Sequence, residues 1–222
     1  MHTQRFEDHS SRFEESVRFF LGATVSQPPG GGALCVVRRR KSYEYRGNPI
    51  NPVRHFKTAN YEVGHLERLP SGMAYPEIIA RISEVQRQPA YSGGIEVTVN
   101  VTEVGKAFLE LCHSAKLHAM GITITTGDAE VYEHHYNRRI PQAQLMGQIQ
   151  TLLHDEKLTI SKHLPDAEGL IRELRNLRLH RTDSGRVRFE GLDRRDDMAT
   201  ALAMATWGAM NFHEMHVEPL RI

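Results

Sequence analysis

Side chains with oxygen atoms stand at three points where an expected strand or helix begins or ends. Thr24 lies near the end of the first strand, Asn100 ends a later strand, and Asp196 and Asp197 begin the last helix. Carboxylate oxygens can bind a hard divalent cation. Acidic residues in a first helical turn also complement the positive end of the helix dipole without any further role. Only the two aspartates carry charge, so any chemistry depends on what the fold places beside them.

Common motifs for nucleotide and zinc chemistry are absent from the sequence. A phosphate-binding loop needs Gly-x4-Gly-Lys-Ser/Thr, but Gly105 and Lys106 are followed by Ala107, and Asn100 stands where the first glycine belongs. The 13 histidines include no HExxH pattern, and no pair of cysteines stands near them. Because a structural zinc site needs four converging ligands, solvated histidines are the better interpretation.

The composition is that of an ordinary globular protein. Hydrophobic residues make up 40% and charged residues 25% of the 222 residues, which is typical of soluble domains. The 28 Lys and Arg against 27 Asp and Glu give a net charge of +1. This balance does not indicate a nucleic-acid binder, although it permits a local basic face.

Cys35 and Cys112 each sit in an apolar run and are expected to be reduced, buried thiols of a cytoplasmic protein. No apolar run approaches the roughly 18 residues of a membrane span, and the first residues lack a signal-peptide core. The sequence therefore predicts a soluble, cytoplasmic protein without a membrane partner.

The first part of the chain alternates like a sheet. Residues 1–16 are polar and patternless and are expected to form a flexible arm. Apolar alternation predicts a strand over residues 17–25, which the turn-forming run PPGGG at residues 28–32 ends. Residues 33–37 are expected to return as a strand. The charged, Pro- and Gly-containing stretch 38–52 is expected to be an exposed loop.

A βαβ unit is predicted over the middle of the chain. The β-branched run 95–101 indicates a strand, and Thr102 is expected to cap a helix whose apolar face includes Phe108 and Leu109. Residues 118–127 then return as a strand, which implies a parallel pair. The following stretch, 127–140, is expected to be a polar loop.

Helices alternate with short extended segments in the last third. Pro141 and Pro165 each open a helix, residues 177–191 are expected to form a hairpin or an extended segment, and DDMATALAMATWGAM is a strongly apolar helix. The pattern predicts one mixed α/β domain over residues 17–212, followed by a C-terminal tail at residues 213–222.

Five segments, in order, resemble the nuclease domain of a phage terminase large subunit over about residues 17 to 210. They are FFLGATV, HLERLPSGMAYPEI, VTVNVTEVGKAFLEL, RRIPQAQLMGQIQTLL and RRDDMATALAMATW. The resemblance implies an RNase H-like α/β fold, with a central mixed β-sheet flanked by helices in a single domain. It extends to the nuclease domain without the ATPase domain of such subunits, and implies a prophage origin.

The resemblance also implies three acidic positions around two divalent cations, Mg²⁺ or Mn²⁺, which would clamp a phosphodiester during cleavage. These positions fall on Thr24, on Asn100 and on Asp196 or Asp197. Because two of them are neutral, the site would lose about two of the negative charges that hold the cations. Glu103 can reach a metal held by either aspartate, although a helix-start carboxylate that complements the helix dipole is the better interpretation.

Three functions follow as alternatives. The first is an inactive nuclease-like domain that binds double-stranded DNA or assembles with phage packaging proteins. The second is an active Mg²⁺- or Mn²⁺-dependent DNA endonuclease with a site rearranged around Asp196, Asp197 and Glu103. The third is a soluble interaction protein with no nucleic-acid role.

A stripe of arginines near the last helix is compatible with DNA contact, and also with a solvated helix and hairpin. The candidate DNA-binding residues are Arg172, Arg175, Arg186, Arg188, Arg194 and Arg195.

Overall fold

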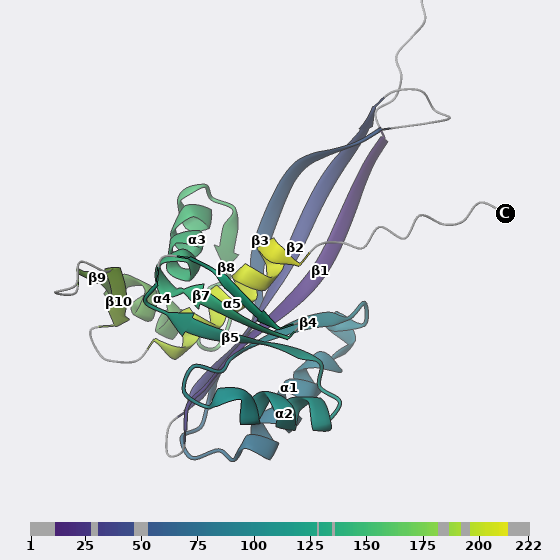
Figure 1. Ribbon diagram of the computed structural model, residues 1–222. Helices are drawn as coiled ribbons and strands as arrows, with labels where there is room; N and C mark the ends of the chain where they lie inside the picture. The colour runs from purple at the N-terminus through teal and green to yellow at the C-terminus, as the bar shows by residue number, and fades with distance from the viewer. Residues whose placement is uncertain are drawn as a thin grey trace, which may run out of the picture.

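The computed structural model describes residues 12–27, 31–46, 53–127, 129–134, 136–181, 187–191 and 196–212. Eight strands form one mixed sheet in the order β6-β7-β5-β4-β1-β2-β3-β8 (Figure 1). They are β1 (Arg12–Val25), β2 (Gly32–Arg46), β3 (Val53–Leu69), β4 (Ile95–Asn100), β5 (Ala119–Thr125), β6 (Val131–His134), β7 (Asn137–Pro141) and β8 (Leu158–Ile160). A separate antiparallel pair consists of β9 (Leu177–Arg181) and β10 (Val187–Gly191). The predicted α/β class with a central mixed sheet is confirmed.

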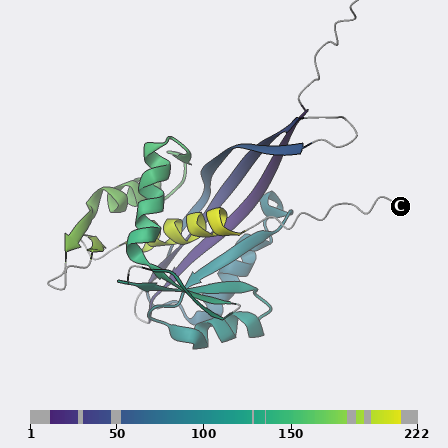
Figure 2. The ribbon, with the colours of Figure 1, turned by 45° about the horizontal axis from the view of Figure 1, so that its top comes forward.

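Helices cover both faces of this sheet (Figure 2) and divide the core into two clusters. On one face lie α1 (Tyr75–Gln86), the short 3₁₀ helix η1 (Pro89–Tyr91) and α2 (Gly105–Ser114). The other face carries α3 (Gln142–His154), α4 (Ala167–Asn176) and α5 (Asp197–Asn211). Within the described residues, none of these helices has the length and apolarity needed to cross a bilayer.

The alternation of β1 sorts its side chains between the two clusters. Leu21 and Ala23 belong to the cluster beneath α1 and α2, whereas Phe20 belongs to the cluster beneath α5. At Gly22 a Cβ atom would lie 2.1 Å from the backbone oxygen of Ala201. The missing side chain at Gly22 therefore lets α5 lie directly on the strand.

The predicted βαβ unit is confirmed, because β4 and β5 pair in parallel with α2 between them. The expected cap at Thr102 is wrong: Val104 holds the N-cap position, and α2 begins at Gly105. Gly105 adopts a positive φ of 68°, which favours glycine. The chain therefore needs a further turn after β4 before the helix can start.

The charged residues 38–46 belong to strand β2, which corrects the loop expected over residues 38–52. β2 continues to Arg46 because its backbone pairs with β1 on one side and with β3 on the other. An ion pair between Arg38 and Glu62 offsets part of the charge. Arg39 is 1% exposed and donates a hydrogen bond of 2.5 Å to a backbone oxygen at the end of α5. Residues 47–52 lie outside the described part of the chain.

β1 begins at Arg12, so residues 12–16 belong to the sheet and not to the flexible arm expected over residues 1–16. Arg12 pairs with Tyr45, and the register continues without interruption into the body of the strand. The backbone groups of this polar segment form their hydrogen bonds with β2, and the polar side chains alone gave no sign of this pairing. Residues 1–11 and the expected tail, 213–222, lie outside the described residues.

The segment expected as a polar loop over residues 127–140 contains β6 and most of β7, a further correction. β7 pairs in parallel with β5, with Gly121 opposite Asn137, and antiparallel with β6. Asn137 and Ile140 are both buried. Position beside β5, and not a local apolar pattern, makes this segment a strand.

Both cysteines are free thiols in the two clusters of the core, as expected. Burial raises the pKa of Cys35 far above its usual range and that of Cys112 to about 11. A thiol that stays protonated is a poor nucleophile and a poor metal ligand. The cysteines therefore belong to packing and not to chemistry.

Candidate functional site

Thr24 and Asn100 lie at the same edge of the sheet, at the carboxyl ends of two neighbouring parallel strands. β1 and β4 pair with Ala23 opposite Val99, so the next residues along both strands are Thr24 and Asn100. The first residue of α5, Asp197, lies against the end of β1. The ends of β1 and β4 and the start of α5 therefore lie at one edge of the sheet, and convergence of the three side chains on a common point stays a prediction.

The Thr24 side chain ties β1 to its neighbours. It is 3% exposed, and its hydroxyl accepts a hydrogen bond of 2.9 Å from the backbone N–H of Ala33. The same hydroxyl donates a bond of 3.1 Å to the backbone oxygen of Asp197. Thr24 thus fixes the start of α5 over the end of the strand, and both hydrogen-bonding roles of its oxygen are already used.

Asn100 organises the turn that follows β4. Its Oδ1 accepts hydrogen bonds from the backbone N–H of Thr102, at 3.0 Å, and from the Thr102 hydroxyl, at 2.6 Å. The Thr102 oxygen in turn accepts a bond of 2.8 Å from the backbone N–H of Ile124 in β5. The amide of Asn100 therefore links the ends of two strands, which is a framework role.

Asp196 and Asp197 begin α5 as expected, with Asp196 at the N-cap position and Asp197 as the first helical residue. Both residues are half-buried. Oδ2 of Asp197 lies 3.8 Å from Nη1 of Arg68, which comes from the end of β3. The carboxylate at this edge of the sheet is thus beside a cation that the chain itself supplies.

Glu173 is a further carboxylate of this region, and sequence reasoning missed its role. It projects from α4 and is 6% exposed. Its Oε2 accepts a hydrogen bond of 2.9 Å from the backbone N–H of Ala199, and its Oε1 accepts one of 2.5 Å from Nη2 of Arg68. The available signal was its position on the apolar face of α4, beside Leu170 and Leu174.

Burial raises the pKa of Glu173, and the negative charge of Asp197 adds to this effect. The hydrogen bonds from Ala199 and Arg68 act in the opposite direction but do not outweigh the desolvation. Glu173 therefore caps the amino end of α5 at a cost in desolvation.

The residues at this edge do not fit two divalent cations held by three acidic positions. Thr24 and Asn100 are neutral, and the oxygens of both already bind the chain itself. The cation beside Asp197 is the guanidinium of Arg68. Among the described residues, no three His, Cys, Asp or Glu side chains are grouped so that they could hold a metal ion.

Glu103 lies in the turn before α2 and is exposed. Its backbone oxygen accepts a hydrogen bond of 2.9 Å from the side-chain nitrogen of Gln27, which follows β1. This contact brings the turn close to the end of β1. Metal binding by Glu103 with Asp196 and Asp197 stays a prediction.

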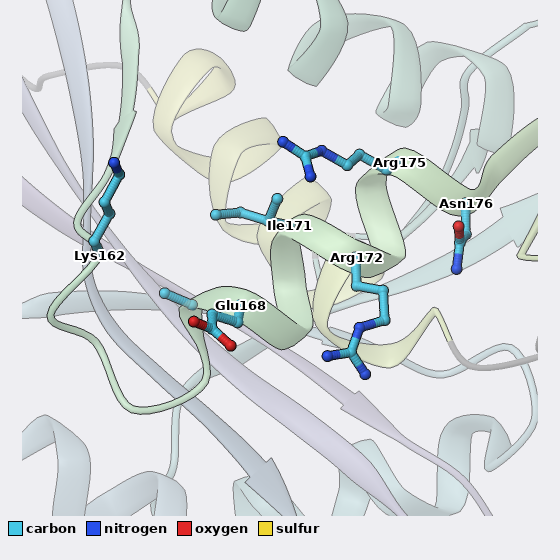
Figure 3. Close-up of a pocket in the computed structure, with 7 residues that line it drawn as sticks. Lys162, Glu168, Ile171, Arg172, Arg175 and Asn176 are labelled. Carbon is cyan, nitrogen blue, oxygen red and sulfur yellow. The ribbon is translucent and has the colours of Figure 1, made fainter.

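The structure describes three of the six candidate DNA-binding arginines. Arg172 and Arg175 lie on the exposed side of α4. Arg188 belongs to β10, and Arg186, Arg194 and Arg195 lie outside the described residues. On the exposed side of α4 an open groove of about 520 Å³ is lined by Lys162, Ala167, Glu168, Ile171, Arg172, Arg175 and Asn176 (Figure 3).

Comparison with solved structures identifies the fold. Two crystal structures of the large terminase nuclease from thermophilic phage G20c, the second with bound magnesium, are 17% and 18% identical to this chain. Both superpose with a TM-score of 0.55, covering 85% and 86% of this chain and 81% of theirs. The large terminase nuclease domain of Thermus phage P74-26 is 16% identical, with a TM-score of 0.52 over 86% of this chain and 80% of its own.

A scan against protein-family models and a search of curated proteins each found no match. At identities below 20%, the structural likeness concerns the path of the backbone. The eight-stranded mixed sheet with helices on both faces, over most of both chains, agrees with the fold that the sequence segments implied. This chain has the RNase H-like fold of the large terminase nuclease domains.

Proposed function

We propose that this chain is a catalytically inactive, terminase-nuclease-like domain that binds double-stranded DNA. The observation that carries the proposal is that Thr24 and Asn100 are uncharged and are hydrogen-bonded within the chain. Both stand where the resemblance implies metal-binding acids.

Inactivity follows from the charge that two-metal cleavage requires. Two cations at about 3.5–4 Å must be held against their mutual repulsion by bridging carboxylates. Here Oδ2 of Asp197 lies 3.8 Å from Nη1 of Arg68. A guanidinium at that distance repels a divalent cation, so the local charge opposes metal binding.

DNA binding is inferred from the retained fold and from the basic side of α4. Arg172 and Arg175 lie on the exposed face of a helix whose opposite face contacts α5 through Glu173. Such an exposed, basic helix face fits contact with a phosphate backbone. The biological setting of this proposal is phage or prophage DNA packaging, with packaging proteins as further partners.

The test combines cleavage and binding measurements on the purified chain. We expect no nicking of supercoiled plasmid in millimolar Mg²⁺ or Mn²⁺, and salt-dependent binding of a fluorescent duplex by anisotropy. Nicking that is abolished by Asp196→Asn with Asp197→Asn would establish the active endonuclease instead. Absence of duplex binding at low salt would favour an interaction protein without a nucleic-acid role.

A further inference from the structure

The helix α4 has two faces of opposite character. Leu170, Glu173 and Leu174 point toward α5 and the core. The other face, at positions three and four residues apart, carries Glu168, Ile171, Arg172 and Arg175, which line the groove. The helix thus separates the carboxylates of Glu173 and Asp197 from a basic surface on its other side, by one helix diameter of ~10 Å.

Basic side chains from two segments of the chain line this groove. Lys162, from the loop after β8, stands across from Arg172 and Arg175 of α4 (Figure 3). Three cationic residues line the groove, and Glu168 is its single acidic residue among the described lining. Within the described part of the chain, neither Lys162 nor Arg172 forms an ion pair.

The shape of the groove selects the class of ligand. It is partly open to the surface and lies between one face of α4 and the loop that carries Lys162 (Figure 3). A small phosphate ester needs an enclosing pocket to be desolvated, whereas a polymer backbone binds along an open basic channel by releasing counterions. Ile171 lies on the groove between the arginines and Lys162 and offers an apolar contact to deoxyribose.

We propose that Lys162, Arg172 and Arg175 form a groove that holds the phosphate backbone of double-stranded DNA. The site rests on the proposed function, because it names the surface by which the domain binds a duplex. It is distinct from the edge of the sheet where Thr24, Asn100 and Asp197 meet. DNA binding is therefore independent of the carboxylates at that edge.

The experiment measures anisotropy of a fluorescent 30-base-pair duplex against the full chain at several KCl concentrations. For Arg172→Gln with Arg175→Gln, we expect roughly tenfold weaker binding at low salt. The slope of log Kd against log [KCl] should fall by about 1.8, which corresponds to two phosphate contacts. Lys162→Gln, outside the helix, should lower the slope by about 0.9.

Two further variants sharpen the test. Arg87→Gln with Lys116→Gln removes the same charge from the α1 and α2 layer and should leave affinity and slope unchanged. Glu168→Gln removes the acidic residue of the groove and should strengthen binding. A circular-dichroism melt of each variant verifies that it is folded.

The outcomes separate the groove from the wider proposal. A parent chain that binds the duplex while the arginine and Lys162 variants bind equally well would overturn the groove and leave DNA binding intact. Equal weakening by the groove and control variants would show that charge alone, and not this site, governs affinity. A parent chain that fails to bind would remove the proposed function and the groove together.

Discussion

Nη2 of Arg68 and Oε1 of Glu173 lie 2.5 Å apart at the amino end of α5, although the two residues are 105 positions apart in the sequence. The second oxygen of Glu173 binds the helix backbone, and the second nitrogen of the arginine faces Asp197. Two carboxylates therefore share one guanidinium. The cationic charge beside Asp197 comes from the chain, and this arrangement holds β3, α4 and α5 together.

The buried carboxyl of Glu173 makes stability depend on pH. Because the folded state raises its pKa, Glu173 contributes most below its unfolded pKa and loses this contribution as pH rises through the folded pKa. The unfolding free energy of the parent minus that of Glu173→Gln should therefore fall from about pH 4 to pH 7. Urea denaturation at a series of pH values measures the difference.

Glu168→Gln is the matched control for this titration, because Glu168 is on the same helix and exposed. The difference in unfolding free energy between the parent and Glu168→Gln should change less with pH than the difference for Glu173→Gln. If the Glu173 difference instead grew with rising pH, the ion pair with Arg68 would outweigh the burial.

Removing the Thr24 hydroxyl should lower the free energy of unfolding of the protein, because this hydroxyl has a structural role. Thr24→Val keeps the shape of the side chain but leaves the Ala33 N–H and the Asp197 oxygen without this partner. A loss of about 2 kcal/mol in the free energy of unfolding is expected. Thr24→Ser retains the oxygen and should lose less; equal losses in both variants would mean that the hydrogen bonds contribute little.

Close contact between β1 and α5 at Gly22 should make that position intolerant of a methyl group. A Cβ atom there would meet the backbone of Ala201 at 2.1 Å and of Ala205 at 2.5 Å. Gly22→Ala should therefore cost about 3 kcal/mol in the free energy of unfolding, since backbone cannot move aside as a side chain does.

Gly64 in β3 is the matched control, because a Cβ atom there would meet nothing within 4 Å. Gly64→Ala should leave the denaturation midpoint nearly unchanged or raise it slightly. A wild-type midpoint for Gly22→Ala would contradict the close packing of α5 on the strand.

Restoring acids at the two neutral positions tests whether they converge on Asp196 or Asp197. Thr24→Asp with Asn100→Asp should melt at a lower temperature without metal, because converging carboxylates repel and because aspartate cannot donate to the Asp197 oxygen. Millimolar Mn²⁺ should then raise its melting temperature by more than that of the parent, by mass action on the folded state.

Thr24→Asn is the control for this repair, since it changes the same strand without adding charge. Its response to Mn²⁺ should match that of the parent. Equal metal-induced shifts in the parent and the double aspartate variant would refute convergence of the three positions.

The sequence by itself determined the elements whose pattern is local. The alternation of β1, the β-branched run of β4 and the apolar α5 were recognisable because their periods are short and the side chains that create them are adjacent. The family resemblance, together with the βαβ pattern, also placed two of the strand ends, Thr24 and Asn100, side by side, and β1 and β4 are neighbours in the sheet. The neutral character of Thr24 and Asn100 was also visible from the sequence alone.

The tertiary structure alone decided which charged residues are buried. Arg39 stands in a run of cations typical of a loop, yet pairing with β1 and β3 makes it part of a strand beneath the end of α5. Glu173 reads as one solvated acid among arginines until Arg68 and the Ala199 N–H meet it. A buried charge depends on partners far away in the sequence, because only their approach offsets the desolvation, and no local period encodes that approach.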